Sequence, residues 1–291
     1  MRYDASDFPQ RITLTARHRA VEAGWSGILD DGHRSVRLED VRAVYYRRPG
    51  RPTVAAAVPE PYATWAREQA DAALLNVVSA LPVRWINNPH HDRLASHKPQ
   101  QLVAAARAGL RVPRSIITND PDEARSFAEQ VGGPIVCKPV VGGRLDAGGR
   151  SLMVATHVLD TTTIDDSLRL TAHYLQEQIP KDHEVRLTVV DGGMFPARIS
   201  TTTAAARTDW RTDPGGLDLS VAHLPGQVAA AVRLFMASYR IGFGAFDFAV
   251  TPAGEWVFFE CNPAGTWAWV ENRTGLPIAA AHADYLRGEA A

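Results

Sequence analysis

The sequence predicts a mixed fold of the α+β or α/β class, with more than one lobe arranged around a cleft. Three observations predict it. The chain has 291 residues, which exceeds the usual size of a single domain. Segments with strand and helix patterns alternate along it, and yet several neighbouring strands are joined by turns short enough for antiparallel pairing. Its composition, with 45% hydrophobic and 22% charged residues, is that of a globular protein.

Charge and cysteine content narrow the classes of function. Lys and Arg number 31 and Asp and Glu 32, so no bulk charge favours nucleic acid or an anionic membrane as a partner. Cys137 and Cys261 each lie in an apolar strand pattern, where we expect reduced, buried thiols. The N-terminus carries charges and Pro9 where a signal peptide needs an apolar core, and no apolar stretch approaches the ~18 residues of a membrane span. We therefore expect a cytoplasmic protein.

The first 90 residues have the pattern of a small α/β unit. From Glu60 to Ala80, apolar residues recur at helical spacing behind Pro61, which predicts a long helix. The strand patterns around this helix are RITLTA, GWSGILDD, SVRLED and VRAVYYRRP before it and VRWINNP after it.

The next part of the chain predicts two helices and two strands. A helix begins near Pro99 and ends at Gly109, a natural C-terminal cap, and the strand RSIITN follows. DPDEARSFAEQVGG is a helix with Asp120 as its N-cap. PIVCKPVVGG is a buried strand that ends in glycines, and a flexible loop is expected at Gly142, Gly143, Gly148 and Gly149.

The remainder predicts strands, a helix, a hairpin and a last helix. The strands are YLQEQI, EVRLTVVDG and GMFPARIST, and the amphipathic helix is PGQVAAAVRLFMASYRIG. FGAFDFAVTPAGEWVFFECNP is a hairpin with its turn at Thr251 to Gly254, and LPIAAAHADYLRG is the closing helix.

Oxygen-bearing side chains meet on the predicted hairpin. Glu260 and Asn262 are two residues apart on one strand and therefore share a face, and Asp247 stands across the ladder from Glu260. Carboxylate and amide oxygens without His or Cys suit Mg²⁺ or Mn²⁺, which also take phosphate oxygens. The alternative is that these are three unrelated polar residues on a solvent-exposed face of the hairpin.

Basic residues elsewhere could hold the phosphates. Lys138 lies in an apolar strand, where a lysine is costly unless it is paired or bound to an anion, and the glycines behind it let backbone N–H groups approach phosphate oxygens. Lys98 precedes a helix, where a simply solvated lysine is the alternative. Arg207 and Arg211 lie in a polar loop and could clamp phosphate or carboxylate.

The order of these elements, with QEQIP between the lysines and the hairpin, resembles the ATP-grasp superfamily of carboxylate ligases from about Asp92 to Pro277. VYYRRP, TDWR and FFECNPAGTWAWVENRTGLPI are similar to the maturases of microviridin-type ribosomal peptides, also called graspetide macrocyclases. The resemblance implies an ATP-grasp fold whose lobes enclose the nucleotide, with an N-terminal pre-ATP-grasp domain at 1–90, a central lobe at 91–174 and a C-terminal lobe at 175–291.

The resemblance also implies roles for individual residues. By this resemblance, Lys98 and Lys138 bind the ATP phosphates, and Gly142 and Gly143 begin the mobile lid over the phosphates. Glu177, Gln178 and Ile179 form the adenine hinge, and Glu184 is the ribose-binding acid. The basic positions near the reacting phosphate are Arg186 and Arg211, and the ligands of Mg²⁺ (or Mn²⁺) are Asp247, Glu260 and Asn262.

The activity that the resemblance implies is peptide macrocyclisation. An Asp or Glu side chain of a precursor peptide becomes an acyl phosphate, and a Ser or Thr hydroxyl or a Lys amine displaces the phosphate to close an ω-ester or ω-amide ring. The leader of the precursor is expected to dock between about Asp160 and Tyr174, and a homodimer is left open. The alternatives are a RimK-like amino-acid ligase, against which RRP and TDWR count, and a nucleotide-binding module without catalysis.

Overall fold

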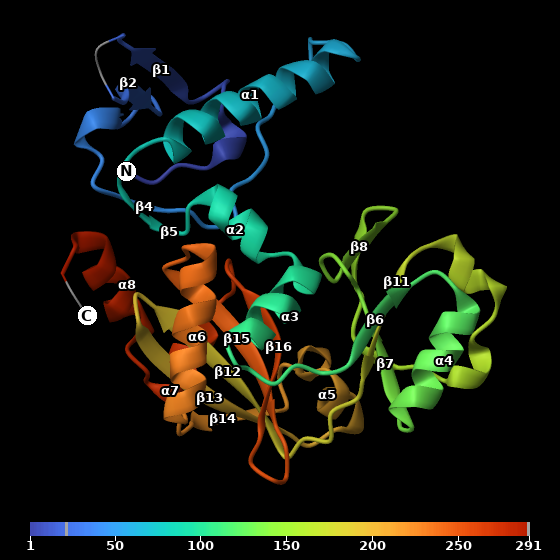
Figure 1. Ribbon diagram of the computed structural model, residues 1–291. Coiled ribbons are helices and arrows are strands. Elements are labelled where there is room, and N and C mark those ends of the chain that lie inside the picture. Colours follow the sequence, from blue (N-terminus) through green and yellow to red (C-terminus); the bar gives the residue numbers. More distant parts are fainter. Residues whose placement is uncertain (21–22, 290–291) are drawn as a thin grey trace.

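The chain is built on three main sheets, each formed by a different part of the sequence (Figure 1). In the computed structural model, which describes residues 1–20 and 23–289, these sheets have the strand orders β1-β2-β3, β10-β7-β11-β6 and β14-β13-β12-β15-β16. Two smaller pairs, β4-β5 and β8-β9, accompany them. The mixed fold predicted from the alternation of helices and strands is confirmed.

The first sheet and one long helix make up most of the N-terminal lobe. The antiparallel strands are β1 (Thr13–His18), β2 (Trp25–Asp30) and β3 (Ser35–Arg37). Helix α1 (Tyr62–Ser79) contributes Leu74 to a core with Leu29 and Leu38. Strand β4 (Ala43–Tyr45) pairs in parallel with β5 (Arg84–Ile86) below this core.

Two helices lead from this lobe toward the rest of the chain, where the sequence predicted one. They are α2 (Pro89–Ala95) and α3 (Lys98–Arg107). The extra helix begins because the Asn88 side chain accepts a hydrogen bond from the His90 N–H at 3.1 Å, the role of an N-cap. Lys98 is consequently the first residue of α3.

The second sheet carries α4 (Pro121–Val131), which is capped as predicted by Asp120 and ended by Gly132 in a left-handed conformation. Its strands are β6 (Ser115–Thr118), β7 (Ile135–Lys138), β10 (His157–Val158) and β11 (His173–Glu177). The predicted flexible loop is instead an antiparallel hairpin of β8 (Arg144–Ala147) and β9 (Arg150–Met153). Gly148 and Gly149, both with positive φ, form its turn. These strands were not predicted because the glycines before and between them favoured a flexible loop.

The third sheet consists of β12 (His183–Val190), β13 (Gly193–Thr201), β14 (Leu217–Val221), β15 (Phe243–Val250) and β16 (Trp256–Asn262). Helix α6 (Gly226–Tyr239) packs on it through Phe235, whose ring contacts Phe246 and Phe258. The predicted β15–β16 hairpin is confirmed. The remaining α-helices of the described residues are α5 (Ala204–Thr208), α7 (Ala268–Thr274) and α8 (Ile278–Arg287).

Both cysteines are free thiols. Cys261 points into the core and is 3% exposed, as the strand alternation predicted, while Cys137 is partly buried. Within 1–20 and 23–289, the helices are all too short or too polar to cross a bilayer.

Candidate active site

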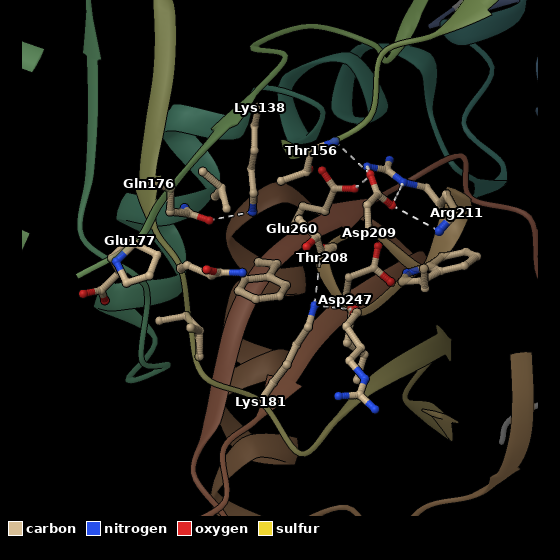
Figure 2. Close-up of a pocket in the computed structure, with 18 of the residues that line it drawn as sticks. Lys138, Thr156, Gln176, Glu177, Lys181, Thr208, Asp209, Arg211, Asp247 and Glu260 are labelled. Carbon is tan, nitrogen blue, oxygen red and sulfur yellow. Dashed lines mark hydrogen bonds and ion pairs between the residues drawn. The ribbon is translucent and has the colours of Figure 1, made fainter. Parts of the chain in front are cut away.

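A cavity of about 370 Å³ separates the second sheet from the third (Figure 2). Its walls come from the ends of β7 and β11, from the segment that links β11 to β12, from α5 and the turn behind it, and from β15 and β16. The cavity therefore joins parts of the sequence that lie more than 100 residues apart, including Lys98 and Glu260.

Two of the predicted cations project into this cavity. Lys98 Nζ lies 3.3 Å from Glu260 Oε2 and donates a hydrogen bond to the Pro139 carbonyl oxygen at 3.0 Å. Its side chain is only 19% exposed, which excludes the alternative of a simply solvated lysine. Lys138 Nζ donates to Gln176 Oε1 at 2.6 Å, and burial lowers the pKa of Lys138 to about 8.

The two predicted carboxylate ligands face each other across the hairpin. Asp247 is paired with Glu260 in the ladder, and both line the cavity. Arg186 Nη1 lies 2.9 Å from each Asp247 carboxylate oxygen. Burial raises the pKa of Asp247 in spite of this contact. Burial also acts to raise the pKa of Glu260, but Lys98 and Arg211 outweigh it and leave that pKa below its usual value.

Asn262, the third predicted ligand, lies farther along β16. It is paired with Ala245, and its Oδ1 accepts a hydrogen bond from the Ala264 N–H at 3.0 Å. It is not among the residues that line the cavity. In the part of the chain that the structure describes, no three His, Cys, Asp or Glu side chains gather to hold a metal. The oxygen donors of Asp247, Glu260 and Asn262 nevertheless fit Mg²⁺, which commonly binds one or two carboxylates and takes further ligands from phosphate and water.

The predicted hinge residues, 177–179, line the cavity. The Glu177 carboxylate points away from it (Figure 2) and pairs with Arg114, with Nε 2.7 Å from Oε2. Gln176, which was not predicted as a site residue, is fully buried and fixes the Lys138 ammonium. A glutamine within an otherwise apolar strand was the sequence feature that could have identified it as a site residue.

Arg211 is held by a residue that the sequence analysis did not assign. Asp209, 5% exposed, accepts hydrogen bonds from Arg211 Nε at 2.8 Å and Nη2 at 2.7 Å. The remaining Nη1 lies 3.9 Å from Glu260 Oε1. Burial acts to raise the pKa of Asp209, but its bonds to Arg211 lower it below the usual value, so the pair is ionised. Asp209 lies two residues before Arg211 in the motif TDWR, so the sequence did contain an indication of this pair.

Of the other predicted residues, Glu184 and Arg207 line the cavity, whereas Arg186, Gly142 and Gly143 lie outside its wall. Arg186 is 4% exposed and reaches the site through Asp247. Gly142 and Gly143 stand at the base of the β8–β9 hairpin, where Gly143 O accepts a hydrogen bond from the Val154 N–H at 2.7 Å. None of these three is among the cavity-lining residues. We therefore assign the glycines to the frame of the hairpin in this structure.

A buried glutamine holds the strand that carries the acids. Strand β16 is at the edge of its sheet, and Gln101 of α3 takes the place of a neighbouring strand. Gln101 Nε2 donates to the Cys261 carbonyl oxygen at 2.7 Å, and Oε1 accepts from the Cys261 N–H at 2.8 Å. Because Lys98 lies one turn earlier on α3, a single helix contacts both the backbone and the carboxylate of β16. No sequence pattern indicated this contact.

Comparisons with known proteins agree with this architecture. Residues 1–93 match the family described as the MvdD pre-ATP grasp domain. A RiPP-associated ATP-grasp ligase of Chryseobacterium gregarium, solved with ADP and a leader and core peptide, is 25% identical. Its match covers 100% of this chain and 89% of that chain, with a TM-score of 0.91.

Two macrocyclases of Microcystis aeruginosa MRC are also similar. MdnB is 29% identical over 98% of this chain and 89% of its own, with a TM-score of 0.76. MdnC, solved with the precursor peptide MdnA, is 23% identical over 99% and 90%, with a TM-score of 0.85. A curated relative, subunit beta 1 of an ADP-forming succinate–CoA ligase from Archaeoglobus fulgidus, is 44% identical over 59 residues. That match spans 20% of this chain and 15% of the relative. The chain has the ATP-grasp fold, and the predicted resemblance to ATP-grasp peptide maturases is confirmed.

Proposed function

We propose that this ATP-grasp chain is an ADP-forming ligase that closes rings in a ribosomally made precursor peptide. One observation carries the proposal. Asp247 and Glu260 face each other in a cavity ringed by lysines and Arg211, and the chain is similar along its whole length to enzymes solved with nucleotide and precursor peptides. The cofactors are ATP and Mg²⁺, for which Mn²⁺ is a proposed substitute.

Each part of the cavity has a proposed task in binding. Lys98 and Lys138 contact the phosphates, and the backbone of 177–179 contacts the adenine edge. Glu184, which is 7% exposed, accepts hydrogen bonds from the ribose. Asp247, Glu260 and Asn262 would hold Mg²⁺, which neutralises charge on the transferred phosphoryl group.

The proposed reaction has two steps. An oxygen of the acceptor carboxylate attacks the γ-phosphorus, the bond to the β-phosphate oxygen breaks, and ADP leaves. A Ser or Thr hydroxyl, or a Lys amine, then attacks the acyl carbon, loses its proton and expels phosphate. Arg211, held in place by Asp209, stabilises the negative charge in both steps. The β8–β9 hairpin is the proposed cover that keeps water from the acyl phosphate.

We also propose where the larger parts of the substrate and protein lie. The leader peptide would dock on 160–174, within the lobe that we place at 91–174, between lobes at 1–90 and 175–291. This segment contains two short 3-10 helices, Thr161–Thr163 and Asp166–Leu170. A cytoplasmic location and a homodimer remain proposals, and gel filtration tests the latter.

The product mass tests the proposed reaction. Incubating the protein with a precursor peptide rich in Thr, Ser, Asp and Glu, encoded beside its gene, together with ATP and Mg²⁺, should lower the peptide mass by about 18 Da per ring, because each condensation removes one water. Brief alkaline treatment should reopen esters and leave amides intact. A gain of mass would point to an amino-acid ligase, and unchanged mass despite ATP turnover would contradict ring closure.

Nucleotide affinity should depend on the charge of Lys138. Because burial lowers the pKa of Lys138 to about 8, the free protein loses this proton as pH rises through 8. The affinity for ADP should therefore fall between pH 7 and 9. Lys138→Met should weaken ADP binding at pH 7 by roughly 1.5 to 3 kcal/mol, the value of a hydrogen bond to a charged group, and flatten the pH dependence. Calorimetry measures both. Wild-type affinity in the variant would make Lys138 a structural partner of Gln176 only.

A further inference from the structure

All three lysines of the chain line the same cavity. The sequence contains 31 Lys and Arg residues, of which only Lys98, Lys138 and Lys181 are lysines. The chain thus uses arginine at every other basic position. Lys98 and Lys138 were predicted to bind phosphate, and Lys181 had no predicted role, although the scarcity of lysine in the chain pointed to it.

Lys181 is bonded to the acid that we place at the ribose. Its Nζ lies 2.6 Å from Glu184 Oε1 and 3.5 Å from the Thr208 carbonyl oxygen (Figure 2). The side chains of Lys181 and Glu184 are 15% and 9% exposed. Within residues 1–20 and 23–289, the hydrogen bond from Lys181 goes to Oε1 and none is formed to Glu184 Oε2. Lys181 therefore fixes one carboxylate oxygen of Glu184, and the other oxygen is available to accept a hydrogen bond from a ligand.

The setting of Glu184 makes this partner necessary. Burial raises the pKa of Glu184 to about 7, and the nearby carboxylates of Asp247 and Asp209 act in the same direction. Lys181 acts against them, through its charge and its hydrogen bond. Without this ammonium, the pKa of Glu184 would rise further, and the Oε1 atom would lose the donor that fixes its orientation.

We infer that Lys181 is a positioning residue for nucleotide binding, which holds the Glu184 carboxylate so that its second oxygen accepts hydrogen bonds from the ribose hydroxyls. This inference rests on the proposed function. A lysine suits the position because its ammonium is a compact charge with three donors, whereas the planar fork of an arginine requires two aligned acceptors. The Phe259 ring lies near both lysines, with its centroid 5.6 Å from Lys181 Nζ and 4.4 Å from Lys138 Nζ.

The test compares ADP with 2′,3′-dideoxyADP, which lacks the ribose hydroxyls. Calorimetry with Mg²⁺ gives the ratio of the two dissociation constants for the wild type, Lys181→Met, Glu184→Gln and the double variant. We expect the wild type to prefer ADP by ~10-fold or more, the value of one hydrogen bond to a charged group. Lys181→Met should reduce this preference to below about threefold.

The double variant shows whether Lys181 acts through Glu184. If it does, the preference for ADP should be the same in the double variant as in Glu184→Gln, because residues that act as a unit are not additive. The double variant removes both buried charges, so it keeps the comparison available where Lys181→Met alone fails to fold. Arg125→Met is the control, since it breaks another ion pair of the i,i+3 type, with Asp122, outside the cavity.

The outcomes separate this inference from the function on which it rests. A wild-type ratio in Lys181→Met, or a further loss of preference in the double variant beyond Glu184→Gln, would overturn the role of Lys181 alone. Failure of the wild type to bind ADP would overturn the proposed nucleotide site together with this inference.

Discussion

Replacing Glu260 with Gln should abolish peptide ligation and leave the fold intact. The carboxylate faces Asp247 and is approached by Lys98 at 3.3 Å and Arg211 at 3.9 Å, so it is both the proposed metal ligand and the partner of two cations. Because metal stabilisation of a transition state amounts to several kcal/mol, we expect kcat/KM to fall by ~10³-fold or more. The side chain is 24% exposed, so its contribution to core packing is small. Phosphate release and peptide mass measure the loss.

Glu255→Gln is the matched control for this variant. Glu255 follows the turn of the same hairpin, its side chain is 56% exposed, and it pairs with Arg111 away from the cavity. We expect this exchange to leave activity within about twofold, since exposed ion pairs contribute little. Full activity in Glu260→Gln, with the control unchanged, would remove Glu260 from the metal site.

The acidic part of the site could be predicted because it depends on local rules. A hairpin with its turn at 251–254 brings Asp247 close to the Glu260 end of the next strand, which local sequence predicts. The turn alone would pair Asp247 with Phe259, and a β-bulge at Asp247/Phe248 shifts the register so that Asp247 pairs with Glu260. The caps of α4 were equally local, since both lie next to the helix in sequence. The fold as a whole followed from the order of such elements and from the resemblance that their motifs carry.

The rest of the site depends on contacts between distant segments, which no local pattern records. Gln101 meets Cys261 across 160 residues, and Glu177 turns from the cavity because Arg114, 63 residues earlier, binds its carboxylate. Asn262 lies on the same strand as Glu260, but its Oδ1 accepts a hydrogen bond from the Ala264 N–H in the turn that follows the strand. Strand periodicity predicts on which face of the sheet a side chain lies, but it does not predict which residue that side chain contacts.

Replacing Arg211 with Lys should remove most of the catalytic rate and little of the nucleotide affinity. The guanidinium uses two donors on Asp209 and directs the third nitrogen toward Glu260, an arrangement that a lysine cannot reproduce. Because the bonds to Arg211 outweigh burial and keep the pKa of Asp209 below its usual value, the variant also leaves a 5% exposed carboxylate without its fork partner. Removing one fixed donor from a developing negative charge costs about 10²–10³ in kcat, and we expect a loss in this range.

Comparing the loss in kcat with the loss in ADP affinity distinguishes a role of Arg211 in transition-state stabilisation from simple phosphate binding. If Arg211 stabilises the acyl phosphate and the transferring phosphoryl group, Arg211→Lys should keep its dissociation constant for ADP within about threefold while the rate of ring formation falls, since only transition-state contacts are lost. Arg198→Lys supplies the control, because Arg198 is 43% exposed and pairs with Asp182 away from the cavity. Equal losses of ADP affinity and rate in Arg211→Lys would instead make Arg211 a ground-state phosphate ligand, like Lys98 and Lys138.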